Sequence, residues 1–198
     1  MLFRSNLCGV SVIDSVDVLF NPPPAIALTS DTNAMCVPGI VQFYDSSVTG
    51  NINDPINTWY WSFGDGTTSS QQNPVHSYSQ PGTYLVTLTV TTDGGCTSNN
   101  SSAPLVINAY PFPVAAFSVN STELNLPYDM LICNNQSAGA VTYLWNFGDG
   151  GTSTAVSPQY LYTSVGIFPV QLIATSQYGC SDTASIDVTT NKIGRAHV

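Results

Sequence analysis

The chain has 198 residues, of which 43% are hydrophobic and only 8% are charged, with 12 Asp and Glu against 3 Lys and Arg and a net charge of −9. This shortage of cations excludes nucleic-acid binding, because contacts to phosphate need Lys and Arg. No apolar run approaches the roughly 20 residues of a membrane-spanning helix, so no membrane span is expected. The ordinary apolar fraction excludes a disordered acidic tail, and the composition, rich in Gly, Pro, Ser and Thr, indicates a soluble β protein of the extracellular kind.

The two ends of the chain resemble a translated sequencing adapter. The last six residues, 193–198, match the translation of a common adapter, and residues 1–5 match its reverse complement. We therefore expect residues 191–198 to be a non-native tail. We expect residues 1–21 to combine a non-native start with the last strand of a truncated upstream repeat, in which Cys8 precedes apolar residues at period two.

The rest of the chain contains two copies of one pattern, offset by 84 residues. The sequence Trp-x-Phe-Gly-Asp-Gly begins at Trp61 and again at Trp145, and the same offset relates Tyr78 to Tyr162 without a gap. Internal repeats of this length predict one small domain each, over residues 22–108 and 109–190. Pro-rich segments at 21–24 and 109–113 are expected as semi-rigid linkers.

Apolar residues within each copy recur at period two rather than 3.6. The alternating apolar residues are Tyr84, Val86, Leu88 and Val90 in the first copy and Phe168, Val170, Leu172 and Ala174 in the second. This alternation is typical of strands with one buried face. Short strands separated by turn signals predict an all-β fold, with one β-sandwich in each copy.

The motifs of the first copy resemble those of the polycystic-kidney-disease (PKD) domain. They are Trp-Ser-Phe-Gly-Asp-Gly at 61–66, Asn-Pro-Val-His-Ser-Tyr at 73–78 and Pro-Gly-Thr-Tyr-Leu-Val-Thr-Leu-Thr-Val at 81–90. The second copy departs from this pattern at Ser157, Tyr160, Val165 and Phe168. The resemblance covers residues 22–190 and implies tandem immunoglobulin-like β-sandwiches. The Gly-Cys endings further resemble PKD repeats of large bacterial surface proteins, such as the gliding and adhesion proteins of Bacteroidetes.

The repeated motif predicts scaffolding rather than chemistry. A tryptophan in each copy is expected to fill the core, and the Gly-Asp-Gly turn to use glycine for positive φ and Asp to bond the main chain. Cation binding by Asp65 or Asp149 is the alternative, but one carboxylate per turn falls far short of the about six oxygens that a hard metal takes. Residues with predicted structural roles are Trp61, Phe63, Gly64, Asp65, Gly66, Tyr84, Trp145, Phe147, Gly148, Asp149, Gly150 and Phe168.

No residue pattern predicts catalysis, a metal site or a cofactor. His76 is the one histidine outside the adapter-like ends, and Tyr160 takes its place in the second copy, so a packing role is predicted. No spacing singles out a pair of carboxylates, and there is no Cys-x-x-Cys, phosphate loop or histidine cluster. We therefore predict that the chain is not an enzyme.

The cysteines are odd in number, namely Cys8, Cys36, Cys96, Cys133 and Cys180, which indicates a missing partner. The implied immunoglobulin-like topology places Cys36 and the late hairpin at opposite ends of one sandwich, too far apart for a disulfide. Repeats stacked head to tail would bring Cys36 near the late hairpin of the next copy, so a Cys36–Cys180 disulfide between repeats is one hypothesis. A Cys133–Cys180 disulfide within the second copy is another, and Cys133 as a buried free thiol is the third.

Taken with the resemblance, these features predict a non-catalytic spacer and adhesion module of a large secreted or cell-surface bacterial protein. Its expected partners are other repeats of the same chain and a surface protein or polysaccharide. The alternative is an accessory substrate-binding module of a secreted hydrolase, because PKD-like domains also occur in bacterial collagenases, chitinases and proteases. Tyr44, Tyr60 or Tyr110 would carry such binding, and a row of rings on one sheet would favour it over the spacer.

Overall fold

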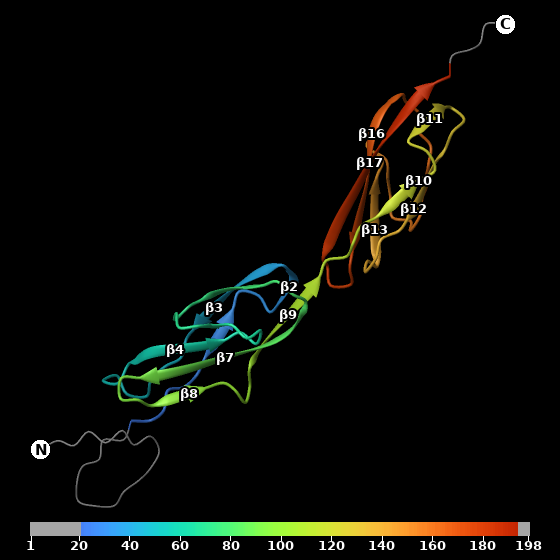
Figure 1. The fold of residues 1–198 in the computed structure, drawn as a ribbon. Helices are drawn as coiled ribbons and strands as arrows, with labels where there is room; N and C mark the ends of the chain where they lie inside the picture. The colour runs from blue at the N-terminus through green and yellow to red at the C-terminus, as the bar shows by residue number, and fades with distance from the viewer. Residues whose placement is uncertain (1–20, 194–198) are drawn as a thin grey trace, which may run out of the picture. The chain divides into compact units, whose positions relative to one another are not determined.

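The computed structural model describes residues 21–193, and every regular element within them is a β-strand (Figure 1). The predicted all-β fold is therefore confirmed. The chain divides into two compact units between Tyr110 and Pro111. The strand predicted within residues 6–20 lies outside the described residues, as do residues 1–5. Of the tail predicted at 191–198, residues 194–198 lie outside them, whereas Asn191 and Lys192 belong to a paired strand, β17 (Ser181–Lys192). The described part of the chain holds no helix that could cross a membrane.

The first unit is a sandwich of two sheets. One sheet has the strand order β1-β3-β6, and the other has the order β2-β9-β7-β4-β5, with β8 also paired to β7. The strands are β1 Leu28–Ser30, β2 Ala34–Val37, β3 Gly39–Asp45, β4 Ile56–Ser62, β5 Thr68–Ser69, β6 Val75–Tyr78, β7 Gly82–Thr92, β8 Thr97–Asn99 and β9 Leu105–Pro111. The central strand β7 pairs with β4 on one side and with β9 and β8 on the other.

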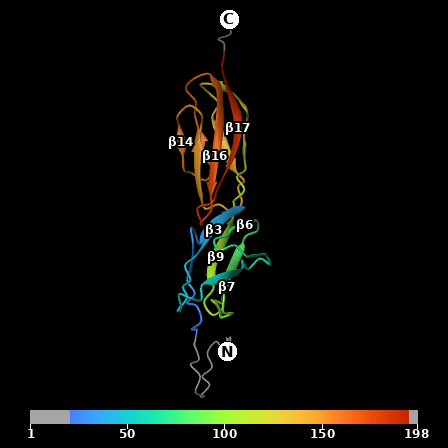
Figure 2. The same cartoon turned by 90° about the vertical axis from the view of Figure 1, so that its left-hand side faces the viewer.

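The second unit repeats this plan with sheets β10-β12-β15 and β11-β17-β16-β13-β14. Its strands are β10 Phe117–Val119, β11 Glu123–Leu126, β12 Leu131–Asn135, β13 Thr142–Asn146, β14 Thr152–Ser153, β15 Gln159–Tyr160, β16 Gly166–Thr175 and β17 Ser181–Lys192. The long hairpin β16–β17 forms the middle of the larger sheet, and Figure 2 shows these two strands side by side. Strand β11 joins the edge of the same sheet, parallel to β17.

The linker predicted at 109–113 begins too early. The segment 109–113 was expected as a linker, but β9 continues to Pro111. Ala109 pairs with Gly82 of β7 and is buried, because β9 needs this length to cover the early part of β7. The Pro residues that suggested a linker therefore stand at and just beyond the end of a strand.

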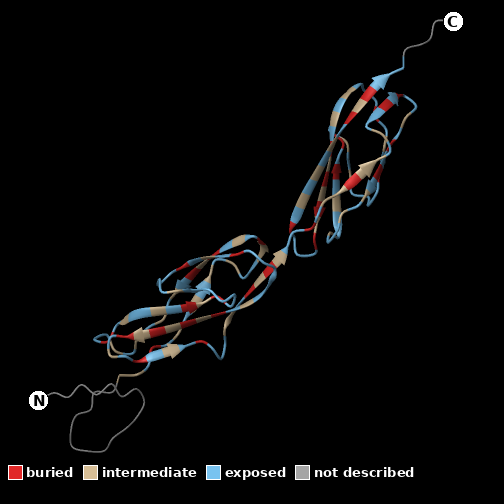
Figure 3. Ribbon diagram, in the orientation of Figure 1, coloured by how far each residue is buried: buried red, intermediate tan, exposed pale blue. Residues whose placement is uncertain are grey.

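Alternation along the long strands places one row of side chains in each core. In β7 the residues Val86, Leu88 and Val90 are fully buried while the residues between them are partly exposed, which gives the banding visible in Figure 3. In β16 the same holds for Val170, Leu172 and Ala174. Each unit closes a core of its own around these rows.

Both motif tryptophans lie at the centre of these cores. Trp61 and Trp145 have 0% exposure. The Trp61 ring lies 5.6 Å from the ring of Phe43 in the facing sheet, and the Trp145 ring lies 5.0 Å from that of Phe117. Since Lys192 is the one Lys or Arg between residues 21 and 193, apolar burial and hydrogen bonds, rather than ion pairs of Lys or Arg, must supply most of the stability of both units.

A buried tyrosine ties the two sheets together in each unit. The Tyr78 hydroxyl donates to the main-chain oxygen of Phe63 at 2.9 Å, and the Tyr162 hydroxyl donates to that of Phe147 at 2.7 Å. Each bond links a residue at or just after the C-terminal end of the edge strand of the smaller sheet, β6 or β15, to the turn after the strand of the larger sheet that carries the tryptophan, β4 or β13. Burial raises the pKa of both hydroxyls well above the ordinary value, so they stay protonated and able to donate.

The structure distinguishes between the hypotheses for the cysteines. Cys133 is buried and free, so the Cys133–Cys180 pairing is wrong. Its side chain belongs to the core of the second unit. Cys36, Cys96 and Cys180 are disulfide-bonded, while Cys8 lies outside the described residues. The Cys36–Cys180 pairing stays a prediction.

The tyrosine bond should be worth about 1–2 kcal/mol to the unit that contains it, because removing the donor leaves a buried carbonyl unsatisfied. We expect Tyr78→Phe to lower the free energy of unfolding of the first unit and Tyr162→Phe that of the second. Urea unfolding followed by assigned amide resonances of each unit measures this. Tyr44→Phe, on an exposed ring, is the control, and an equal loss in that variant would contradict the assigned role.

The Cys133 thiol should be inert in the folded protein, because burial hides it and raises its pKa to about 11. We expect Ellman's reagent to label Cys133 at least roughly 100-fold more slowly in the native protein than in urea. Mass spectrometry of the labelled peptide identifies the site. Prompt labelling under native conditions would show that the thiol is accessible.

Candidate functional site

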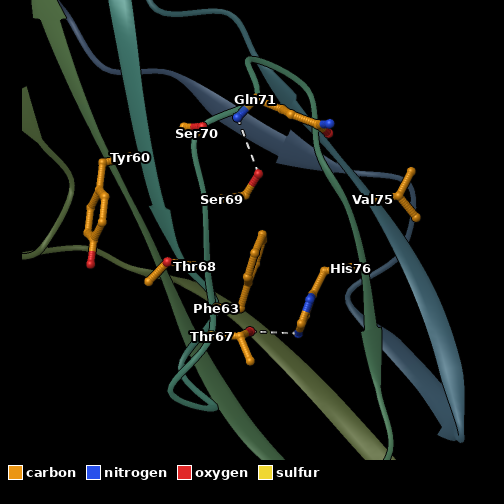
Figure 4. A pocket seen from close by; sticks show the side chains of 9 residues that line it. All are labelled: Tyr60, Phe63, Thr67, Thr68, Ser69, Ser70, Gln71, Val75 and His76. Atoms are coloured by element: carbon orange, nitrogen blue, oxygen red, sulfur yellow. Dashed lines mark hydrogen bonds between the residues drawn. The ribbon is translucent and has the colours of Figure 1, made fainter.

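An open hollow of about 640 Å³ lies at one edge of the first unit and is here called the edge hollow. It lies between β5 and β6, the edge strands of the two sheets. Its walls are the segment 67–71 with Tyr60 on one side, and Val75 and His76 on the other, with Phe63 between them (Figure 4). This volume is within the range of small-molecule sites.

Glycine positions the turn that leads into this region. Gly64 has φ +82°, and a Cβ there would meet the main chain of Leu85. Gly148 has φ +83° and would meet the main chain of Pro169 in the same way. Both the left-handed conformation and the close approach therefore require glycine after the motif phenylalanine.

Asp65 and His76 form a polar pair beside the hollow. The Asp65 carboxylate accepts hydrogen bonds from the main-chain N–H (3.0 Å) and the hydroxyl (2.6 Å) of Thr67. His76 Nε2 lies 2.8 Å from Asp65 Oδ2, and its ring stacks on Phe63 at a centroid distance of 4.0 Å. Burial alone would raise the pKa of Asp65, but the Thr67 bonds and the hydrogen bond and charge of His76 together hold it below the ordinary value.

This pair is not arranged as a catalytic relay. Thr67 Oγ1 lies 3.4 Å from the same His76 nitrogen that contacts Asp65. A relay needs the acid on one ring nitrogen and the nucleophile on the other. The arrangement therefore serves to hold the turn and the imidazole in place.

The second unit builds the same contact with a different ring. The Tyr160 hydroxyl donates to the Asp149 carboxylate at 2.9 Å, and its ring stacks on Phe147 at 3.9 Å. Gly151 stands where the first unit has Thr67, and a Cβ at Gly151 would collide with the Tyr160 hydroxyl. The longer Tyr160 side chain thus requires glycine at position 151. The offset of 84 residues shows both substitutions in the sequence, but only the structure shows that they are coupled.

The two buried indoles differ in their hydrogen bonding. Trp145 Nε1 donates to the main-chain oxygen of Ala155 at 3.0 Å. Gln71 is the equivalent of Ala155, yet the buried Trp61 Nε1 has no hydrogen-bond partner. The segment around Gln71, which forms one wall of the edge hollow, therefore lacks a tether to the core that the second unit has. No signal in the sequence reveals this difference.

A second polar cluster surrounds Asp54, which is 3% exposed. Its carboxylate accepts from the Thr92 hydroxyl at 2.9 Å, the Gly94 N–H at 2.6 Å and the Asn21 amide at 3.0 Å. Neutral donors thus satisfy the buried charge. Residues 21–193 contain no group of three or more His, Cys, Asp or Glu side chains that could hold a metal ion. Asp54 lies in the stretch that only the first copy contains, so comparing the repeats could not single it out.

The three candidate tyrosines do not form a row. Tyr44 lies on β3 of the smaller sheet, whereas Tyr60 lies on β4 and Tyr110 on β9 of the larger one. Tyr60 pairs with Thr89 of β7. Ala109, which precedes Tyr110, pairs with Gly82 of the same strand. These positions are seven residues apart along β7, or about 23 Å. By the criterion set from the sequence, this dispersal favours the spacer.

The coupled residues can be exchanged between units. We expect His76→Tyr alone to lower the free energy of unfolding of the first unit by about 1–3 kcal/mol, because the longer ring meets Thr67. Adding Thr67→Gly should recover most of this loss, as in the second unit. A double-mutant cycle in urea measures the coupling, and additive effects of the two substitutions would contradict it.

The Asp65 contacts make the first unit sensitive to acid. A carboxyl whose pKa is lowered by folding adds stability above its ordinary pKa of about 3.9, and this stability is lost as the pH falls through the lower folded value. We expect Asp65→Asn to flatten the fall in unfolding free energy of the first unit between about pH 5 and pH 2. Urea titrations at each pH measure it, and equal slopes in both proteins would contradict the assignment.

Comparison with known proteins identifies the family. The PKD domain matches residues 21–107 and 108–190. Collagenase ColA of Bacillus cereus is 32% identical over 107 residues, 54% of this chain and 11% of the collagenase. Pre-pro-metalloprotease PrtV of Vibrio cholerae is 30% identical over 134 residues, 67% of this chain and 14% of the protease. The chain thus spans only a small part of the length of these relatives.

Among solved structures, the crystal structure of the PKD1 domain of Vibrio cholerae PrtV is 33% identical, covering 40% of this chain and 98% of that domain with a TM-score of 0.36. The PKD1 domain of Vibrio anguillarum Epp is 26% identical, covering 46% of this chain and 98% of that domain with a TM-score of 0.39. Because the family match accounts for both copies of the repeat, the chain belongs to the PKD domain family and consists of two PKD domains in tandem.

Proposed function

We propose that the two PKD domains are a non-catalytic module of a larger extracellular protein, where they act as a spacer and adhesion element that contacts proteins or polysaccharides. The observation that carries this proposal is the exchange of His76 for Tyr160 on the same aspartate. What both units retain is a ring stacked on the motif phenylalanine and bonded to the turn. Retained packing with altered acid–base chemistry supports a structural role.

Several features support a location outside the cell. Cys36, Cys96 and Cys180 are disulfide-bonded, and disulfides persist in oxidising compartments. The net charge of −9 favours solubility and disfavours self-association. The relatives are named as collagenases and a metalloprotease, and collagen is an extracellular substrate.

An accessory substrate-binding role within a secreted hydrolase is the second candidate. Two observations favour it, namely the edge hollow of the first unit and the names of the relatives. In this role the hydrolase domain would be a separate part of the parent protein. The two roles are compatible, since a spacer that also binds substrate holds the catalytic part near it.

Single-molecule pulling of the chain under reducing conditions tests the spacer role. We expect two separate unfolding events, each releasing chain on the order of 250 Å long, because each unit has a core of its own. Extension of the chain without a force peak would contradict the spacer role.

Hydrolysis assays on gelatin, casein and nitrophenyl esters test the non-catalytic assignment. We expect no turnover by the purified chain. Turnover that His76→Gln abolishes, with the fold intact by circular dichroism, would overturn the assignment.

A further inference from the structure

We propose that the edge hollow of the first unit binds a neutral, hydroxyl-rich ligand, namely a sugar unit of a glycan. This inference rests on the proposed function and names the ligand class of its binding role. The site lies where two edge strands part, so a ligand reaches it from solvent without disturbing the core.

The lining supplies the two contacts that a sugar ring requires. Tyr60 offers an aromatic face that is 54% exposed, and the apolar C–H face of a pyranose stacks on such rings. The hydroxyl residues Thr68, Ser69 and Ser70 and the amide residue Gln71 also line the hollow, with Thr68 and Ser70 on the Tyr60 side of the segment in Figure 4. Hydroxyls and amides both donate and accept, which matches the alternating needs of sugar hydroxyls.

The charges around the hollow favour a neutral ligand. Lys192 is the one Lys or Arg between residues 21 and 193, and it lies in the second unit. An anionic ligand would therefore find no Lys or Arg in the described part of the first unit. A cationic ligand would find Asp65 already bonded to Thr67 and His76.

The second unit changes part of this lining while keeping the framework, and it retains hydroxyls at Thr152, Ser153 and Thr154. At the offset of 84, Leu144 replaces Tyr60 and Ala155 replaces Gln71. Tyr160 and Gly151 replace His76 and Thr67, as described above. Phe63 and the buried core positions keep their residues or their apolar character across the two units. The aromatic ring and the amide of the lining are thus absent from the second unit, which serves as an internal control.

The wall formed by Gln71 also lacks a hydrogen bond that its counterpart in the second unit makes. Trp145 Nε1 holds the main chain at Ala155, whereas Trp61 Nε1 has no partner. Buried donors of this kind are rare in folded proteins.

Titration of the full chain with neutral hexasaccharides of glucose, N-acetylglucosamine, xylose and mannose, followed by amide NMR shifts, tests the proposal. We expect at least one to bind in the micromolar-to-millimolar range and to shift amides of residues 67–71 and 76. Tyr60→Leu, which installs the residue of the second unit, should weaken binding roughly tenfold, the loss expected for a stacked ring. Tyr44→Leu makes the same change on an exposed ring of the other sheet and should leave binding unchanged.

Absence of binding by all four sugars would overturn the proposal, and so would unchanged affinity of Tyr60→Leu. A collagen-like triple-helical peptide is titrated in parallel. If this peptide shifts the same amides and no sugar does, the assigned ligand class is wrong. None of these results bears on the pulling and hydrolysis experiments, so a failure here is distinguishable from a failure of the spacer role.

Discussion

The structure depends on burying one large aromatic ring between two sheets in a chain with almost no cations. Between residues 21 and 193 a single Lys is present, so surface ion-pair networks are unavailable. Trp61 and Trp145 supply the area that the sheets bury, and Tyr78 and Tyr162 add a hydrogen bond in a setting without competing water. Burial and hydrogen bonding of this kind are not weakened by ionic screening as surface ion pairs are.

Comparison of the two units separates what the fold needs from what is free to change. The Gly-Asp-Gly turn, the core tryptophan and the tyrosine–carbonyl bond are the same in both. The ring that stacks on the motif phenylalanine is His76 in one and Tyr160 in the other, with a compensating change at Thr67 and Gly151. The surface at Tyr60 and Gln71 changes without compensation in the core. Such independence lets a repeated scaffold carry different surfaces.

Much of the fold follows from the sequence because its physical causes are local. Period-two alternation marks β7 and β16, and the glycines mark turns where positive φ is needed. The linker expected at 109–113 is different, because pairing of Ala109 with Gly82 is a contact over a long sequence distance that outweighs the local signal of the prolines. The cysteine pairings also depend on contacts between residues far apart in the sequence, so the local sequence does not determine them.

The candidate site was less accessible to sequence reasoning. Tyr60 is one of three candidate tyrosines in the sequence, together with Tyr44 and Tyr110, but no sequence pattern places it beside a hollow between β5 and β6. The unpaired indole of Trp61 and the donors around Asp54 depend on how loops pack. Loop packing follows from the folded structure rather than from residue type.

The central claim is that each unit is held together by its own tryptophan core. Residue-resolved hydrogen–deuterium exchange of Trp61→Leu and Trp145→Leu variants tests it most directly. We predict that protection falls throughout the strands of the substituted unit and persists in the other, because the ring loss costs about 2–4 kcal/mol locally. Protection that survives in the substituted unit would contradict the claim.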